Sequence, residues 1–312
     1  MNELKEALKA WGAQHVRLIK DRENAVHEVR VGKERAALRL HRPGYMSAAA
    51  IRSELDWMGA LSQAGMEVPA PISSRDGQAV IALSTGRLAT MVTWVDGQPI
   101  GDGGVPFDIP VNEQVALYHK LGRELARLHN ITDTLTLPQG FTRHRWDLDG
   151  LLGETPFWGR FWESPALPES DRHLVNRARA VARDRAQAYL ENGADFGLIH
   201  ADALRENVFI KDGELMLIDF DDAGFGFRLY ELAVMMTQNE DEPAADQIRD
   251  AAIAGYRELR DFSAEAEELL PMFIMLRRFA SMGWAVPRYE LSDPTLIGYT
   301  ERAVAAARQF LA

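Results

Sequence analysis

The sequence predicts an α+β fold with two lobes, a small N-terminal lobe built on an antiparallel sheet and a larger, mostly helical C-terminal lobe. Short apolar runs typical of strands dominate the first part of the chain. From residue 112 onward, apolar residues recur mainly at the three- and four-residue spacing of helices. A Gly-, Pro- and Asp-rich stretch at residues 97–110 separates the two patterns, as is typical of a boundary between compact units. We therefore expect lobes at residues 1–96 and 97–312.

Composition narrows the class of protein. Of the 312 residues, 46% are hydrophobic and 26% are charged, as in ordinary globular proteins, and no apolar run is long enough to span a membrane. Cysteine is absent, which excludes disulfides and thiolate metal sites, and the eight histidines lack the spacing of zinc ligands. A net charge of −11 disfavours nucleic acid or an anionic membrane as the main partner. The start of the chain reads as an amphipathic helix rather than a signal peptide, so we expect a cytoplasmic protein.

The first lobe is expected to hold two groups of strands. Strands are predicted between residues 16 and 41, with a turn at Gly32-Lys33, and again over residues 79–84 and 88–95. In the strand that ends at Leu40, the alternation of side chains places Arg39 on the face opposite Leu38 and Leu40. A positive charge is therefore predicted on one face of a buried strand.

A helix is predicted between the two groups of strands. Ser47 is a suitable N-cap residue, and Gly65 ends the helix before an extended Val-Pro-Ala-Pro segment. Its apolar stripe is formed by Ile51, Leu55, Met58 and Leu61. Glu54 lies on this helix near the stripe rather than opposite it.

The second lobe is expected to be helical around one hairpin. Helices are predicted at about residues 112–129 and 171–192, with an aromatic-rich loop between them, and from Gly226 to the end. The apolar runs at residues 208–210 and 215–218 flank Asp212-Gly213, a strong hairpin signal. With a two-residue turn, cross-strand partners have numbers that sum to 425.

Polar residues gather at the open end of this hairpin. Position 207 faces position 218, so Asn207 is expected beside Asp219. The loop that enters the same end carries His200, Asp202 and Arg205. We therefore expect two carboxylates and an amide oxygen close together, which are the ligand types that Mg²⁺ prefers. The alternative is that these residues only cap strand ends.

The order of these residues resembles that of protein-kinase-like phosphotransferases. The catalytic-loop pattern H-x-D-x-x-x-x-N is matched at residues 200–207, and the metal-binding Asp-Phe is matched by Asp219-Phe220. Each half is a weak match alone, but a hairpin of the right length joins them. His200 is expected to hold the loop by hydrogen bonds rather than to take part in chemistry.

The chain as a whole resembles the aminoglycoside phosphotransferase, choline kinase and type II homoserine kinase group, which has a protein-kinase-like fold. The match covers most of the sequence and also rests on residues 38–40, Glu54, the extended segment at 68–71 and Tyr230-Glu231-Leu232-Ala233. Residues 22–24 and 41–44 look like the bacterial stress-response Ser/Thr kinase branch. Three positions depart from the usual pattern: Ala201 for Gly, Glu231 for Asp, and Arg39 for Lys.

The resemblance implies ATP and Mg²⁺ as cofactors and assigns roles to individual residues. Asp202 would be the base, and Asn207 and Asp219 the metal ligands. Arg39 and Glu54 would hold phosphates, unless they form a plain surface ion pair. Arg205 either touches the transferring phosphate or forms an ion pair between loop and helix.

Further nucleotide contacts are expected in the first lobe. The phosphate-covering loop would lie at residues 21–25 and include Asn24, although it lacks glycine. No G-x-x-x-x-G-K-[ST] occurs anywhere, which excludes a P-loop NTPase. Thr93 and Val95 are the candidate hinge residues whose backbone would meet adenine.

The acceptor is expected to be a hydroxyl of a small molecule such as homoserine, choline or an aminoglycoside. An aromatic box would suit a quaternary amine, an acidic run at residues 240–242 a polycation, and Arg277, Arg278 or Arg288 a carboxylate. The aromatic candidates are Trp146, Trp158, Trp162, Trp284 and Tyr289. Two other functions stay open: a protein Ser/Thr kinase and a nucleotide-binding pseudokinase that regulates a partner.

Overall fold

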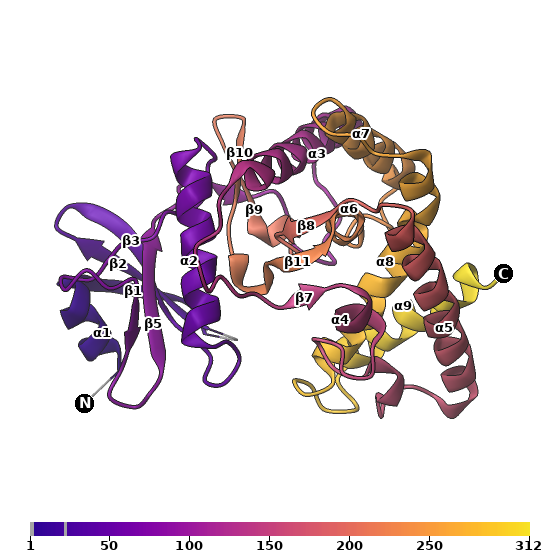
Figure 1. Ribbon diagram of the computed structural model, residues 1–312, viewed down its shortest axis with the longest axis horizontal. Coiled ribbons are helices and arrows are strands. Elements are labelled where there is room, and N and C mark those ends of the chain that lie inside the picture. The colour runs from indigo at the N-terminus through magenta and orange to yellow at the C-terminus, as the bar shows by residue number, and fades with distance from the viewer. Residues whose placement is uncertain (1–2, 22–23) are drawn as a thin grey trace. The chain divides into compact units, whose positions relative to one another are not determined.

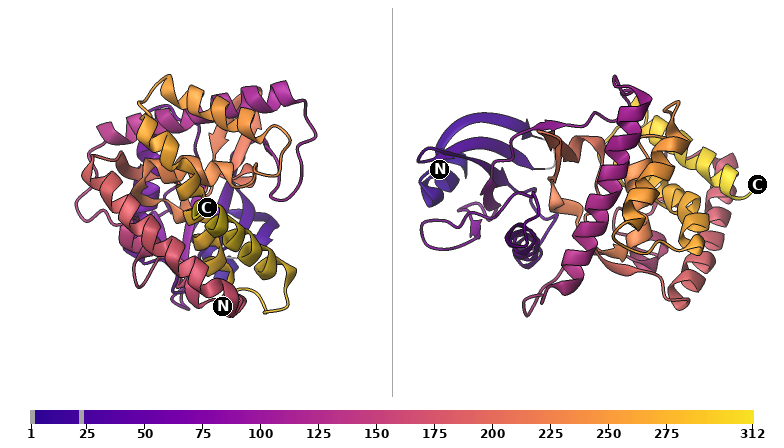
Figure 2. Two further views of the ribbon diagram at one scale, coloured as in Figure 1. Left: turned by 90° about the vertical axis from the view of Figure 1, so that its right-hand side faces the viewer. Right: turned by 90° about the horizontal axis from the view of Figure 1, so that it is seen from above.

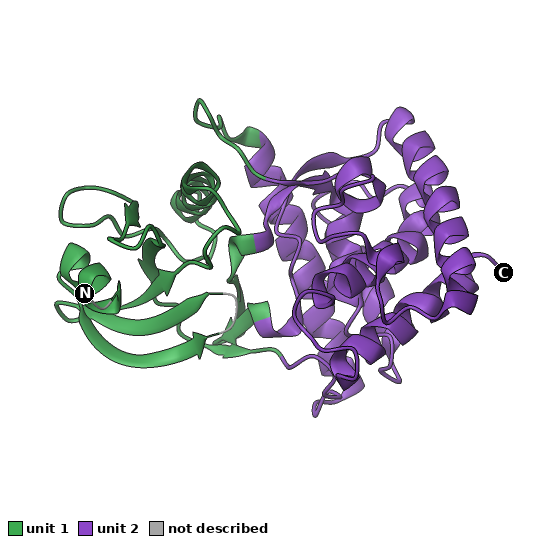
Figure 3. Ribbon diagram, turned by 90° about the horizontal axis from the view of Figure 1, so that it is seen from below, with its two compact units in different colours: residues 1–100, 134–143, 207–221 green, residues 101–133, 144–206, 222–312 purple. Residues whose placement is uncertain are grey.

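The computed structural model describes residues 3–21 and 24–312 and divides the chain into two compact units (Figure 3). Unit 1 comprises Met1–Ile100, Thr134–Arg143 and Asn207–Asp221, and unit 2 comprises Gly101–Asp133, His144–Glu206 and Asp222–Ala312. This division differs from two consecutive lobes, because the hairpin and the segment at 134–143 belong with the first unit. Arg22 and Glu23, in the expected phosphate-covering loop, lie outside the described residues.

Unit 1 is built on a five-stranded antiparallel sheet with strand order β1-β2-β3-β5-β4. The strands are β1 (Gln14–Asp21), β2 (Ala25–Val31), β3 (Glu34–Leu40), β4 (Val80–Ala82) and β5 (Leu88–Thr93). The expected strands and the turn at Gly32-Lys33 are confirmed, although β4 and β5 are shorter than predicted. Leu38 and Leu40 are buried on one face with Ala7 and Trp11 of α1 (Glu3–Trp11). Helix α2 (Ala48–Gln63) covers the other face (Figure 1).

Helix α2 begins and ends as its sequence indicates. The Ser47 hydroxyl oxygen accepts a hydrogen bond from the Ala50 N–H at 3.1 Å, which satisfies a free donor of the first turn. Gly65, just past the end, has a φ of 81°, a left-handed conformation that glycine adopts without strain. The predicted apolar stripe is buried, and Glu54 is buried with it.

The hairpin has the predicted register. Strands β9 (Val208–Lys211) and β10 (Glu214–Leu217) pair Lys211 with Glu214 and Val208 with Leu217. Asp212 and Gly213 have φ values of 52° and 82°, as a type I′ turn requires. β6 (Gln98–Pro99) adds a third strand beside β9. At the open end, the Ile218 N–H donates to the Asn207 carbonyl at 3.0 Å, so the prediction that position 207 faces 218 is confirmed.

Unit 2 is mostly helical. Its helices are α3 (Val111–Thr134), α4 (Leu148–Leu152), α5 (Glu169–Glu191), α6 (Arg228–Met236), α7 (Ala245–Arg257), α8 (Ala264–Ala285) and α9 (Pro294–Phe310). Helix α8 packs against α6 and α9, and α9 also packs against α5 (Figure 2). Short 3₁₀ turns occur at Phe161–Glu163, Arg205–Asn207 and Phe220–Asp222. Within the residues that the structure describes, no helix is long and apolar enough to cross a membrane.

A small sheet in unit 2 was not anticipated from the sequence. It consists of β7 (Arg145–Trp146), β11 (Gly224–Phe227) and β8 (Phe196–Ile199), with β11 in the centre. β8 leads directly into the loop that begins at His200, so the sheet anchors the start of that loop.

Candidate active site

Arg39 is the centre of a charged cluster in unit 1. Its Nη1 lies 3.3 Å from Glu54 Oε1 and 3.4 Å from Asp221 Oδ1, and its Nη2 lies 3.0 Å from Asp219 Oδ1. The Arg39 and Glu54 side chains are only 17% and 3% exposed, so this is not a plain surface ion pair. The alternation of β3 explains the arrangement, because it points Arg39 toward α2 while its neighbours fill the core.

Asp219 and Asn207 offer oxygen ligands at the open end of the hairpin. Asp219 has a φ of 63°, a left-handed conformation that Asp tolerates better than most residues. Its side chain is 39% exposed, whereas Asn207 is buried. A carboxylate and an amide oxygen fit a hard cation such as Mg²⁺, which completes its coordination with phosphate oxygens and water. Among the described residues, no cluster of three or more His, Cys, Asp or Glu forms a self-contained metal site.

Burial sets the charge state within the cluster. Burial raises the pKa of Glu54 to about 7, and the guanidinium groups of Arg143 and Arg39 oppose that rise. Arg143, which the sequence analysis did not single out, donates to Glu54 Oε2 at 3.3 Å. No local pattern marks residue 143, because its partners come from α2 and from the turn after β10.

The other predicted nucleotide residues of unit 1 already have protein partners. Asn24 Nδ2 donates to Asp221 Oδ2 at 2.9 Å, and its Oδ1 accepts from the Arg42 N–H at 2.9 Å. The Thr93 N–H donates to the Ala70 carbonyl at 2.8 Å, so any contact of Thr93 with adenine would use its carbonyl, and its role stays a prediction. The role of Val95 stays a prediction.

The loop at residues 200–205 lies in unit 2 and is held by Glu231 of α6. The Glu231 carboxylate accepts from the His200 N–H at 2.5 Å and from the Ala201 N–H at 3.1 Å. Burial raises the pKa of Glu231 to about 7 against the effect of these two hydrogen bonds. His200 is buried and its Nδ1 accepts from the Asp202 N–H at 3.2 Å, which is the structural role expected of it.

Ala201 explains why glycine is usual at its position in the resembling family. Its φ is 62°, which costs an alanine about 1–2 kcal/mol relative to the right-handed region. Its N–H is bound by Glu231 and its carbonyl by Arg277, so both sides of the residue are fixed. The expectation that alanine is tolerated here is consistent with this support.

Asp202 is paired with buried Arg277, which was a candidate to bind a substrate carboxylate. Arg277 Nη2 of α8 lies 2.7 Å from Asp202 Oδ1, and Nη1 donates to the Ala201 carbonyl at 3.0 Å. The guanidinium also lies 4.6 Å from the ring centre of Trp158. Arg277 therefore fixes the candidate base instead of serving as a carboxylate-binding residue for a substrate. The convergence of Asp202 with Asn207 and Asp219 stays a prediction, because Asp202 belongs to the other unit.

Residues 15–265 match the model of the phosphotransferase enzyme family. The chain belongs to this family. It is 23% identical to the amicoumacin kinase of Bacillus subtilis over 97% of this chain and 89% of that protein. It is 26% identical to the homoserine kinase of Neisseria meningitidis serogroup B, over 68% of this chain and 63% of that protein. The solved structure of a microcompartment-associated aminopropanol kinase superposes with a TM-score of 0.84 at 30% identity, covering 99% of this chain and 96% of that one.

These comparisons confirm the expected family and the two-lobed, protein-kinase-like fold class. The protein is accordingly a phosphotransferase of the kinase type, with an alcohol group as acceptor.

Arg205 has a structural role in this phosphotransferase. Its Nη2 contacts Glu242 Oε1 and Asn239 Oδ1, both at 2.7 Å, and its Nη1 donates to the Val105 carbonyl at 2.7 Å. The residue is 2% exposed and its guanidinium lies 3.7 Å from the ring centre of Phe107. Of the two roles expected, the structure shows the ion pair, and we withdraw Arg205 from the catalytic set. Glu242 is therefore bound within the protein, and the role of the acidic run at residues 240–242 in binding a polycation stays a prediction.

The aromatic residues that are candidates for binding the acceptor substrate differ in how deeply they are buried. Trp146 is fully buried and stacks on Tyr230 with ring centres 5.3 Å apart, and Trp162 lies under Arg179. Both belong to the core rather than to an aromatic box. Trp158, Trp284 and Tyr289 are half-buried and form a chain of rings with centres 6.3 and 6.2 Å apart. These three remain as aromatic candidates, and Trp158 touches the arginine that holds Asp202.

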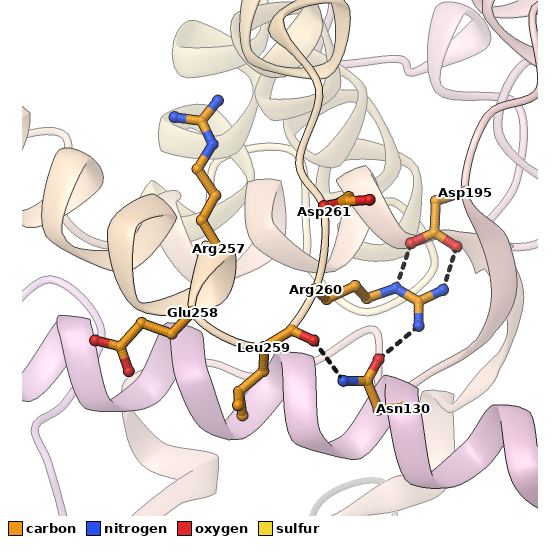
Figure 4. Close-up of a pocket in the computed structure, with 7 residues that line it drawn as sticks. All are labelled: Asn130, Asp195, Arg257, Glu258, Leu259, Arg260 and Asp261. Atoms are coloured by element: carbon orange, nitrogen blue, oxygen red, sulfur yellow. Dashed lines mark hydrogen bonds and ion pairs between the residues drawn. The ribbon is translucent and has the colours of Figure 1, made fainter.

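A separate polar pocket of about 570 Å³ lies elsewhere in unit 2 (Figure 4). Arg260 closes one side by a fork to Asp195 with two distances of 2.6 Å, and it also donates to Asn130. The remaining lining residues are Arg257, Glu258, Leu259 and Asp261. None of them belongs to the loop at 200–207, and the partly buried Arg260 is neutralised by Asp195 within the protein, so we do not assign the reaction to this pocket.

Proposed function

We propose that this phosphotransferase moves the γ-phosphoryl group of ATP, with Mg²⁺, to the hydroxyl of a small molecule. The observation that carries the proposal is the contact of Arg39 with both Glu54 and Asp219 at the end of the hairpin that also bears Asn207. A strand cation held by a helix Glu beside an Asp-Phe turn is the set of groups that kinases of this fold use for nucleotide phosphates.

Each chemical role falls to a residue of this chain. Asn207 and Asp219 would hold Mg²⁺, which neutralises charge that develops on the phosphates. Arg39 would bind phosphate oxygens with its planar fork. Asp202 would orient the acceptor hydroxyl and take up its proton late in the transfer. Because phosphoryl transfer depends mainly on positioning and electrostatics, the ion pair of Asp202 with Arg277 supports this role by fixing the carboxylate.

For the acceptor, we propose an amino alcohol as the first class to test. The relative with 30% identity over almost the whole chain is an aminopropanol kinase. The half-buried rings of Trp158 and Trp284 already attract the guanidinium groups of Arg277 and Arg288, so an organic cation would have to share or displace them. Homoserine, choline and aminoglycosides follow as related acceptors.

The test is a coupled ADP-release assay with Mg-ATP and a panel of acceptors. Aminopropanol, ethanolamine, choline, homoserine and aminoglycosides form the panel, and Asp202→Ala is the control. We expect Asp202→Ala to lower turnover by about 10²–10⁴-fold, the contribution of a positioned base, while Mg-ATP still binds. Asp219→Ala is expected to weaken Mg-ATP binding itself. Full activity of Asp202→Ala would show that the base is misassigned, and a labelled protein band in place of a small-molecule product would favour a protein kinase.

A further inference from the structure

Glu54 has two arginine partners, although one would neutralise it. Its Oε1 lies 3.3 Å from Arg39 Nη1, and its Oε2 lies 3.3 Å from Arg143 Nη1. The side chains of Glu54 and Arg143 are 3% and 1% exposed. All of these residues belong to unit 1. The second arginine needs an explanation, because taking a further charged group out of water costs free energy even when it is paired.

Arg143 also donates hydrogen bonds to main-chain carbonyls of two segments, α2 and the turn after Asp219. Its Nη1 donates to the Ala50 carbonyl of α2 at 3.1 Å. Its Nη2 donates to the carbonyls of Phe220 at 3.0 Å and Asp221 at 2.6 Å. One guanidinium therefore joins α2 to the turn that follows Asp219. The rings of Phe220 and Trp57 pack edge to face between the same two segments, with centres 5.4 Å apart.

Arg39 is attached differently, because its partners are all carboxylates. It contacts Glu54, Asp219 and Asp221. To bind phosphate oxygens it must give up some of these contacts, and a metal ion on Asp219 would compete for the same oxygens. The contacts with Asp219 and Asp221 are the ones to be exchanged, since the proposed function keeps Arg39 on Glu54. Arg143 on Oε2 then holds the Glu54 carboxylate in place with Oε1 toward Arg39.

We propose that Arg143 is a positioning residue of the nucleotide site: it is the permanent counter-ion of Glu54 and the clamp on the Asp219–Asp221 turn, which leaves Arg39 able to exchange carboxylates for phosphates. This rests on the proposed function. Arginine is needed because its fork reaches three carbonyls and a carboxylate at once, whereas lysine is a point charge on a flexible stem.

The test measures binding of Mg²⁺ with a non-hydrolysable ATP analogue by calorimetry, together with thermal unfolding. The variants are Arg143→Gln, Arg143→Lys and Glu54→Gln, alone and combined. Arg87→Gln is the control. Arg87 likewise donates hydrogen bonds to main-chain carbonyls, those of Leu40 and His41, and to a carboxylate, Glu3, without touching the site.

We expect Arg143→Gln to weaken nucleotide binding at least tenfold, Arg143→Lys to weaken it less, and Arg87→Gln to leave it unchanged. In the Glu54→Gln background the loss caused by Arg143→Gln should shrink, since the two residues then no longer couple. If Arg87→Gln weakened nucleotide binding equally, or if Arg143→Gln bound nucleotide with unchanged affinity, the role of Arg143 would be overturned and the proposed function would stand. An Arg143→Gln protein that fails to fold while Arg143→Lys binds like the unaltered protein would also overturn that role. If the unaltered protein binds no Mg-nucleotide, the proposed function fails as well.

Discussion

The pair of Asp202 and Arg277 permits a sharp test in unit 2. Arg277→Met keeps the length of the side chain and its packing against Trp158 but removes the cation. The lost interactions include the 2.7 Å contact to Asp202, the 3.0 Å hydrogen bond to the Ala201 carbonyl and the attraction of the guanidinium to the Trp158 ring. The matched control is Arg278→Met one position along α8, because Arg278 pairs with Glu240, whose side chain is 39% exposed.

The two variants should differ in stability by several kcal/mol. Removing one partner of a buried ion pair costs about 3–5 kcal/mol, and the lower end applies here because the Asp202 side chain is 18% exposed. An ion pair with an exposed partner is worth about 0–1 kcal/mol. We therefore expect Arg277→Met to lower the free energy of unfolding by about 3 kcal/mol or more, and Arg278→Met by less than about 1 kcal/mol.

Urea unfolding and the ADP-release assay measure the two consequences separately. Because an error of about 1 Å in the placement of a catalytic group can cost about 100-fold in rate, turnover of Arg277→Met should fall by that order under conditions where the variant is folded. Binding of Mg-ATP should be unaffected, since the nucleotide residues we propose lie in unit 1. The reasoning would be refuted if Arg277→Met and Arg278→Met had the same urea midpoint and the same turnover.

Two further predictions concern buried groups of unit 2. Arg205→Met removes the buried partner of Glu242 and is expected to cost about 3–5 kcal/mol in urea unfolding; a variant of normal stability with lost turnover would instead restore the phosphate-binding role. Glu231 has a pKa of about 7 in the folded protein against an ordinary value of 4.5, so the folded state binds more protons than the unfolded state between these values. Its contribution to stability is therefore complete below about pH 4.5, is lost as the pH rises toward 7, and amounts to about 3 kcal/mol at about 1.4 kcal/mol per pKa unit. Unfolding curves of the unaltered protein and Glu231→Gln measured across this range should show that slope only in the former, and parallel pH profiles would contradict it.

Local sequence signals were sufficient to predict the hairpin and the strand–helix pair. The turn at Asp212-Gly213 fixes the register of β9 and β10, because both residues must adopt a positive φ. The period of two in β3 and the apolar stripe of α2 determine which way Arg39 and Glu54 point. Their pairing itself was inferred from the resemblance to kinases, in which a helix Glu holds a strand cation, and the structure shows the contact.

The second arginines could not be predicted in the same way. Arg143 lies in an irregular segment, and its partners are distant in sequence. Arg277 follows the helical pattern of α8, but the pattern does not say which buried carboxylate it will meet. Arg205 was ambiguous because its partner, Glu242, follows α6 at a position that no local pattern connects to the loop. Long-range partners of buried charges depend on how elements pack, and packing is not encoded in a short window of residues.

Each unit has a strained residue at, or next to, a proposed functional carboxylate, and an arginine holds it in place. In unit 2, Ala201 has a φ of 62° and its carbonyl is bound by Arg277, which also binds Asp202. In unit 1, Asp219 has a φ of 63°, and the next two carbonyls are bound by Arg143. Such conformations cost about 1–3 kcal/mol each and persist only where the surroundings fix them. Since arginine satisfies main-chain carbonyls and carboxylates together, it can hold the strain and the charge at one point, which is why we expect neither arginine to be replaceable by lysine without loss.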